Sequence, residues 1–271
     1  MFSFASNKDD ENSGISESKI LKVISIFNTK NHLEFLLQKE KRFFRFMDTE
    51  LQFYVDLPGN YCPDNDLGAK LFENVDIVLN HEQISRKSTA HDYSLSSHFF
   101  CHANYDENFI NTSYAANGIY DPRSVDSGPF LQRLNRWRKG EKIDKIIEIE
   151  GVEYKLPFYR YYVTTQINHG LARETDVLPA NMTINIRFHR ASAECAILLL
   201  DSKIEAVKTS DNSKHKLTYK YEESVIPIQN PVLAAFYAFS PELESTMNRV
   251  RNSTMEIDYT GKFCQIYFDK N

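Results

Sequence analysis

The sequence predicts an all-β protein, and three observations carry this prediction. Residues 182–189 alternate strictly, with Met182, Ile184, Ile186 and Phe188 on one side and Thr183, Asn185, Arg187 and His189 on the other. A period of two is typical of a strand with one face in the core. Residues 51–57 alternate in the same way. Aromatic residues, which favour strands, make up 13% of the chain.

Strand patterns separated by turn residues recur along most of the chain. The expected strands are residues 20–27, 32–37, 42–47, 51–57, 75–79, 146–149, 152–158, 159–167, 182–189, 195–200, 217–228, 255–259 and 263–268. Residues 202–213 alternate weakly and hold a polar loop. Two neighbours, 42–47 and 51–57, are expected to pair with each other. Glu150-Gly151 is expected to be the turn of a hairpin, and Asn230-Pro231 is expected to end a strand.

Short helices are expected at two places among these strands. Leu95, Phe99 and Phe100 have helical spacing within residues 93–105. A second short helix is expected to start near Ser240, because Pro241 favours the first turn of a helix. Residues 108–130 are rich in turn residues and predict a long contact loop.

Composition excludes several classes of protein. The net charge of −5 gives no basic field for non-specific nucleic-acid binding. The four cysteines, Cys62, Cys101, Cys195 and Cys264, have no CxxC spacing, so neither a zinc ribbon nor a disulfide framework is predicted. No secretory or membrane-spanning segment is recognisable. Residues 1–18 have little to bury and predict a mobile N-terminal arm.

Three groups of residues could carry chemistry, and each has a plainer interpretation. His98 and His102, with Cys101 between them, have the i, i+4 spacing of a zinc pair, but a third ligand is missing nearby. His169 precedes a glycine as a catalytic base might in a tight turn, yet no nucleophile elbow accompanies it. Residues 131–145 are basic around Trp137, which suits either a nucleic-acid contact or a solvated or subunit face. We therefore predict no catalytic, cofactor-binding or metal residues.

Four segments in order resemble the double jelly-roll capsid proteins of the Polinton (Maverick) and adintovirus type. They are LGAKLFENVDIVLNHEQISRKS, FLQRLNRWRKGEKI, NHGLARETDVLPANMTINIRFHRASAECAILL and EIDYTGKFCQIYF. The resemblance spans roughly residues 51–268. It implies two antiparallel jelly-roll sandwiches side by side, trimerising into pseudo-hexagonal capsomers of an icosahedral shell.

The domain organisation expected from the resemblance is an arm at 1–18, a first jelly roll at 19–200 and a partial second roll at 201–271. About seventy residues are too few for a second eight-strand sandwich. The late strands therefore either add to the first roll or await a missing half or a second chain.

The predicted function is that of a non-enzymatic viral or Polinton-type capsid building block. Its expected partners are copies of itself, as a homotrimer and in neighbouring capsomers, and a penton or minor capsid protein; no cofactor, membrane or specific nucleic acid is expected. The expected location is the virion, assembled inside the host cell and not secreted. Two alternatives remain open, a host-retained capsid-derived interaction module and a cupin-like enzyme or ligand-binding protein.

Overall fold

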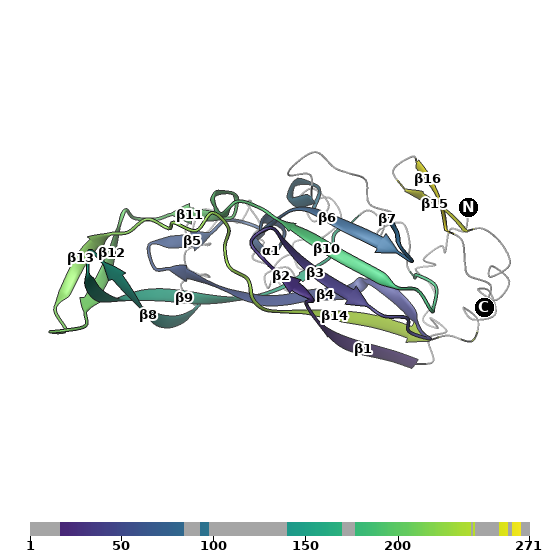
Figure 1. Ribbon diagram of the computed structural model, residues 1–271, viewed down its shortest axis with the longest axis horizontal. Helices are drawn as coiled ribbons and strands as arrows, with labels where there is room; N and C mark the ends of the chain where they lie inside the picture. The colour runs from purple at the N-terminus through teal and green to yellow at the C-terminus, as the bar shows by residue number, and fades with distance from the viewer. Residues whose placement is uncertain are drawn as a thin grey trace, which may run out of the picture.

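The computed structural model describes residues 17–83, 93–97, 140–169, 177–239, 241, 255–259 and 262–266, most of which are strand (Figure 1). The strands are β1 (Glu17–Ile24), β2 (Phe27–Asn28), β3 (His32–Leu37), β4 (Phe43–Pro58), β5 (Tyr61–Pro63), β6 (Phe72–Leu79), β7 (Glu82–Gln83), β8 (Glu141–Ile149), β9 (Val152–Gln166), β10 (Ile184–Arg190), β11 (Ile197–Leu199), β12 (Lys203–Lys208), β13 (Lys214–Thr218), β14 (Gln229–Phe239), β15 (Met255–Tyr259) and β16 (Lys262–Ile266). Short helical turns are α1 (Leu67–Lys70), residues 93–97 and η2 (Ala193–Cys195). The all-β prediction is confirmed.

Two antiparallel sheets pack face to face as a jelly roll (Figure 1). One sheet has the order β1-β14-β4-β9, and the other has the order β2-β3-β10-β6-β7. The chain crosses between the sheets at almost every long connection, and the first and last strands of the sandwich are neighbours. This double Greek-key arrangement is that of a jelly roll, and it confirms the predicted fold class.

The alternating segments form strands because each has one wholly apolar face. Met182, Ile184, Ile186 and Phe188 are all buried, as predicted for residues 182–189. In β4, Leu51, Phe53, Val55 and Leu57 are also buried, again as predicted. The turn at Glu150-Gly151 has positive φ at both residues, 52° and 77°, which matches the twist of the β8–β9 hairpin.

Strand β4 is one continuous strand of 16 residues where two strands, 42–47 and 51–57, were expected to pair with each other. The residues between the two segments form a bulge, since Phe236 of β14 pairs with Arg45 while Ala234 pairs with Glu50. Thr49 closes the bulge. Its buried hydroxyl donates to the carbonyl of Arg45 over 2.7 Å and accepts the N–H of Phe236 over 3.1 Å. Residues 152–166 likewise form the single strand β9 rather than two.

The core lies between the two sheets and combines aliphatic side chains with several contacting aromatic rings. Phe53 of β4 meets Phe72 of β6 across the sandwich, with ring centroids 6.4 Å apart. Phe188 of β10 packs against both Phe72 and Phe35, at 4.9 and 6.1 Å. These edge-to-face and tilted arrangements are favourable for aromatic pairs.

Strand β14 places residues 229–239 inside the first sandwich, although the first jelly roll was expected to end at residue 200. It lies between β1 and β4, and Leu233, Ala235 and Tyr237 belong to the main core. The strand also includes Asn230-Pro231, which was expected to end a strand. Asn230 has φ 48° and sits at a register shift, which lets the proline occupy a bulge. Residues 229–239 thus add to the first roll, one of the two outcomes left open by the sequence.

Residues 219–228 connect β13 to β14 and are not strand, although residues 217–228 were expected to be one. This connection is fastened to the sandwich by hydrogen bonds. Asn28 donates through its side chain to the carbonyl of Ile228 over 2.8 Å, and the N–H of Ala193 donates to Ser224 over 2.8 Å. The buried guanidinium of Arg190 donates to the carbonyl of Ile226. Hydrogen bonds from two side chains and one backbone N–H elsewhere in the fold therefore replace the pairing that a strand would provide.

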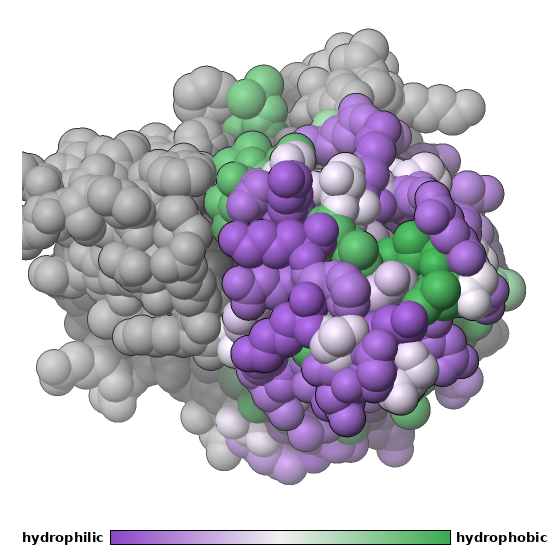
Figure 2. All heavy atoms as spheres, turned by 90° about the vertical axis from the view of Figure 1, so that its left-hand side faces the viewer, coloured by the Kyte–Doolittle hydropathy of each residue, from purple (hydrophilic) through white to green (hydrophobic). Residues whose placement is uncertain are grey.

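A lobe formed by β8, β9, β12 and β13 extends from one end of the sandwich, on the left of Figure 1. It has a small core of its own, in which Leu156, Phe158, Ile204 and Ala206 are buried. Figure 2 looks onto this end and shows a largely hydrophilic surface interrupted by small hydrophobic areas. The lobe is therefore built from two hairpins that enclose their own apolar contacts.

A buried polar cluster joins α1 to the helical turn at residues 93–97. Asp66, which precedes α1 in the left-handed region at φ 60°, is 1% exposed. One of its carboxylate oxygens, Oδ2, is buried without a hydrogen-bond partner. Ser97 accepts a hydrogen bond from the side chain of Asn168 over 2.9 Å. Burial raises the pKa of Asp66 to about 7.

Candidate interaction surfaces

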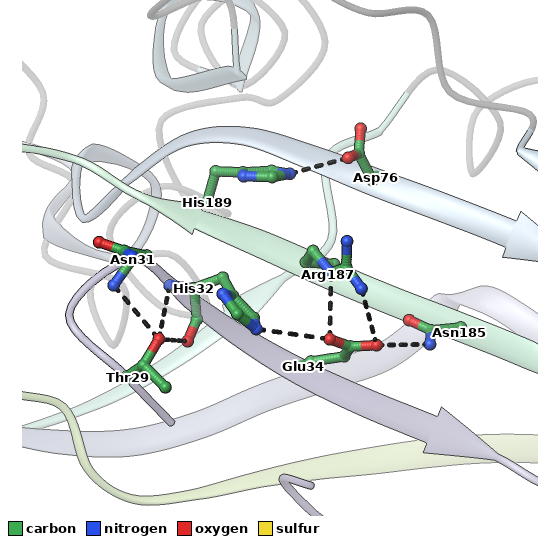
Figure 3. Close-up of polar contacts among 8 residues, drawn as sticks. All are labelled: Thr29, Asn31, His32, Glu34, Asp76, Asn185, Arg187 and His189. Atoms are coloured by element: carbon green, nitrogen blue, oxygen red, sulfur yellow. Dashed lines mark hydrogen bonds and ion pairs between the residues drawn. The ribbon is translucent and has the colours of Figure 1, made fainter. Parts of the chain in front are cut away.

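The outer face of the sheet β3-β10-β6 carries a network of polar side chains, here called the polar face (Figure 3). Its members are His32 and Glu34 of β3, Asn185, Arg187 and His189 of β10, and Asp76 of β6. These side chains point away from the core because their strand neighbours point into it. The register places Arg187 opposite both Glu34 and Asp76.

Glu34 is the centre of the polar face. Arg187 donates to it through Nε over 3.0 Å and through Nη2 over 3.2 Å, and Asn185 donates over 2.6 Å. Its side chain is only 4% exposed although it lies on an outer face. Burial alone would raise the pKa of Glu34, but the hydrogen bonds from Arg187 and Asn185 outweigh it, so the pKa lies below its ordinary value.

Two histidines complete the polar face without making a catalytic set. His189 Nε2 lies 2.7 Å from Asp76, and His32 Nε2 lies 3.5 Å from Glu34. The nearby hydroxyl of Thr29 is occupied in a turn, where it accepts the N–H groups of Asn31 and His32 (Figure 3). The polar face therefore presents ionisable side chains at the surface of the sheet. This arrangement is suited to contact with a partner rather than to nucleophilic chemistry.

We expect the substitution Arg187→Leu to lower the free energy of unfolding by about 1–3 kcal/mol at pH 7, because it leaves the Glu34 carboxylate without its bidentate partner. The depressed pKa of Glu34 means that this stabilisation is present above the unfolded pKa near 4.5 and is lost as the pH falls through the folded pKa. Urea unfolding at pH 7 and at pH 3 measures both effects.

The matched control for Arg187→Leu is Lys30→Leu, which removes an exposed pair with Glu223 at 3.2 Å. That change is expected to cost less than about 0.5 kcal/mol. Equal losses for the two variants, or a loss that does not shrink at pH 3, would contradict the central role given to Glu34.

A second charge cluster lies on the outer face of the other sheet, around Asp56. Arg160 donates to it over 2.9 and 3.2 Å, Lys145 over 3.0 Å and Gln229 over 2.9 Å. The guanidinium of Arg160 also stacks 4.1 Å from the ring of Tyr54. Burial tends to raise the pKa of Asp56, yet these donors lower it below its ordinary value. The cluster ties β4 to β8, β9 and β14.

Apolar side chains remain exposed where both sheets end on the same side of the sandwich, here called the apolar edge. β1 is the last strand of one sheet, and β2, which follows it in the chain, is the last strand of the other. Ile20, Ile24, Ile26 and Phe27 are exposed there, Ile24 by 75% and Phe27 by 53%. An edge strand with such side chains is a template for pairing with another chain.

Few of the candidate residues discussed in the sequence analysis lie in one of these surface clusters. His169 is buried in the loop after β9, beside Asn168. His98, His102, Cys101 and most of the basic stretch 131–145 lie outside the described residues. Lys145 belongs to the described end of that stretch and pairs internally with Asp56. Cys62 is buried and Cys195 is exposed, and neither forms a disulfide with another described cysteine.

One constellation was not predicted from the sequence. The hydroxyl of Ser213 donates to Asp211 over 2.6 Å and lies 2.7 Å from His215 Nε2, on the turn between β12 and β13. In a nucleophilic triad the carboxylate would orient the histidine. Here both groups contact the serine instead, so the arrangement stabilises a turn. Among the described residues, no three His, Cys, Asp or Glu side chains cluster as metal ligands.

Comparison with known proteins gives structural similarities alone. No family model and no curated protein sequence matches the chain, and none of the helices in the described part is long and apolar enough to cross a membrane. The fold is similar to PBCV-1 VP54, as fitted into a reconstruction of the virophage Sputnik, with 13% identity over 89% of this chain and 46% of that one and a TM-score of 0.39.

Two further structures are similar at the same level. The quasi-atomic model of the PBCV-1 virus capsid has 12% identity over 89% of this chain and 46% of that one, with a TM-score of 0.39. The Faustovirus major capsid protein has 8% identity over 89% of this chain and 57% of that one, with a TM-score of 0.45. The chain thus spans about half the length of the solved structures that it resembles.

Proposed function

We propose that this chain is a structural building block of a viral-type capsid, which acts by associating with copies of itself. The observation that carries the proposal is the contrast between the inside and the edge of the jelly roll. The interior is packed with aliphatic and aromatic side chains, whereas the apolar edge keeps Ile24 and Phe27 exposed. Exposed apolar side chains at the edge of such a sandwich offer a surface for contact with another molecule.

The filled interior also separates this proposal from the cupin-like alternative. A cupin-like enzyme would place convergent histidines or carboxylates between its sheets. In this chain the corresponding space is occupied by Phe44, Phe46, Phe53, Phe72 and Phe188. The two described clusters of ion pairs, around Glu34 and Asp56, instead lie on the outer faces of the sheets. The host-retained interaction module would share these surfaces and differ in not forming particles.

The finer assignment follows the sequence resemblance. A Polinton-type capsid protein would trimerise, form pseudo-hexagonal capsomers and meet a penton or minor capsid protein in the virion. The jelly-roll topology is compatible with each of these roles, and the wide outer sheet faces supply flat areas for side-by-side packing.

We expect the purified chain to associate into trimers, with a mass three times that of one chain, when its concentration is raised. Multi-angle light scattering measures the mass, and negative-stain microscopy shows whether capsomers or shells form. Ile24→Asp is expected to weaken association by at least tenfold, because a carboxylate replaces an apolar side chain that is buried on contact.

The matched control is Ile146→Asp, which changes the same residue type at a site 62% exposed on the lobe. It is expected to leave association unchanged. A monomer at every concentration would overturn the proposal for the isolated protein, whereas trimers that do not assemble into shells would favour the host-retained module.

A further inference from the structure

We propose that the free edge of β1 is covered by the β15–β16 hairpin of a second copy of this chain. This inference rests on the proposed function, because it names the segment through which copies associate. It is an exchange of strands between neighbours, in which backbone hydrogen bonds supply the attraction and side chains supply the specificity.

The first observation is the open edge itself. β1 pairs through all eight of its residues with β14, from Glu17 opposite Phe239 to Ile24 opposite Val232. No described strand pairs with its other side. In an edge strand, alternate N–H and C=O groups face away from the sheet and stay unpaired. β1 thus offers a regular row of unpaired backbone groups next to Ile20 and Ile24.

The second observation is a hairpin that lacks a sheet. β15 and β16 pair with each other through five residues, from Met255 opposite Ile266 to Tyr259 opposite Lys262. Within the described part of the chain they form a separate two-stranded sheet. A two-stranded hairpin is marginally stable in water, and a third strand is what gives such a unit independent stability. β1 would therefore provide the third strand that the hairpin lacks, and the hairpin would pair with the unpaired backbone groups of β1.

The position of the hairpin points to a second copy. In Figure 1 the yellow hairpin lies beyond β7 on the upper side of the sandwich, whereas β1 forms its lower border. The hairpin of one chain is therefore not on its own β1. Fifteen residues separate β14 from β15, and they could span at most about 50 Å when extended. A tether of that reach allows the hairpin to contact the edge of a neighbour that lies alongside.

Charge complementarity identifies β15 as the strand that lies against β1. β15 has the sequence MEIDY, with Glu256 and Asp258 as its charged residues. On β1, Glu17 and Lys19 are already paired within the chain, with Arg42 and Glu40. Lys22 is exposed and makes no ion pair with any described residue. Opposite charges across paired strands stabilise the pairing, and like charges oppose it.

Hydrogen exchange of the full chain, followed by mass spectrometry over a range of concentrations, tests the inference. We expect the amides of β1 to become protected as the concentration rises. The control is β13, an edge strand of the same sheet, whose outward amides should stay unprotected at every concentration. In the variant Ile257→Pro, which cannot support a central β15, the protection of β1 should be lost while that of β4 and β9 is kept.

A charge swap separates direct pairing from a general effect on association. Asp258→Lys is expected to weaken association about fivefold, and adding Lys22→Asp in the same chain is expected to restore it. Association without protection of β1 would overturn this inference and leave the proposed function standing. Protection that does not depend on concentration would mean that each chain covers its own edge, which also overturns it. A chain that never associates would overturn both proposals.

Discussion

Replacing Phe188 by alanine is expected to lower the free energy of unfolding by about 3–5 kcal/mol. The ring is 1% exposed and packs between Phe35 and Phe72, which belong to the strands on either side of β10. Its removal leaves a cavity in the middle of the sheet, which the rigid strands around it cannot fill. Urea unfolding at pH 7, followed by circular dichroism, measures the change.

Phe27→Ala is the matched control, since Phe27 is the same residue type at a site 53% exposed on β2. Its expected cost is below about 1 kcal/mol when the protein is dilute. Losses of similar size for the two variants would show that the centre of the sandwich is less tightly packed than the ring contacts indicate.

Asp66→Asn is expected to stabilise the protein at pH 8 by about 2–4 kcal/mol and to have little effect at pH 4. The pKa of Asp66 is raised from 3.8 to about 7 by burial, so the folded state binds the proton more tightly than the unfolded chain does. The contribution of Asp66 to stability is therefore most favourable below pH 3.8, falls as the pH rises towards 7 and is level above that. Asparagine is neutral throughout and avoids this loss.

Urea unfolding of both proteins at several values between pH 4 and pH 8 provides the measurement. The control is Asp64→Asn, because the carboxylate of Asp64 is partly exposed and paired with Lys70. That variant should not gain stability at pH 8. Parallel pH profiles for the unmodified chain and Asp66→Asn would show that Asp66 is not held in its protonated form by the fold.

The sequence was sufficient to predict those strands and turns that depend on residues close by in the chain. Residues 51–57 and 182–189 alternate because one face of each meets the core, and the structure buries the expected side chains. The turn at Glu150-Gly151 was likewise predictable, since a two-residue hairpin selects residues that tolerate positive φ. These features depend on neighbours only a few positions away.

The sequence was insufficient to predict features that depend on contacts between residues far apart in the chain. The alternation of residues 51–57 places Asp56 on the outer face, where an exposed side chain is expected. Asp56 is nevertheless buried, because Lys145, Arg160 and Gln229 converge on it from three other strands. β4 passes through its bulge because Thr49 bonds to Phe236 of β14. The position of β14 was not predictable for the same reason, since nothing near residue 230 indicates that its partners are β1 and β4. The central role of Glu34 could not be predicted either. It follows from the position of Glu34 opposite Arg187, which is known only once the register between β3 and β10 is known.

The pairing of β1 with β14 has a consequence for synthesis in the cell. Glu17 can find its partner only after Phe239 has left the ribosome, so this sheet cannot close while the first 239 residues are being made. Contacts so far apart in sequence also carry a large loop-closure cost, which predicts slow folding. Until β14 arrives, β1 and β4 expose unpaired backbone and apolar side chains. The nascent protein therefore passes through an aggregation-prone intermediate. The yield of folded protein should depend on chaperones and on the rate of translation.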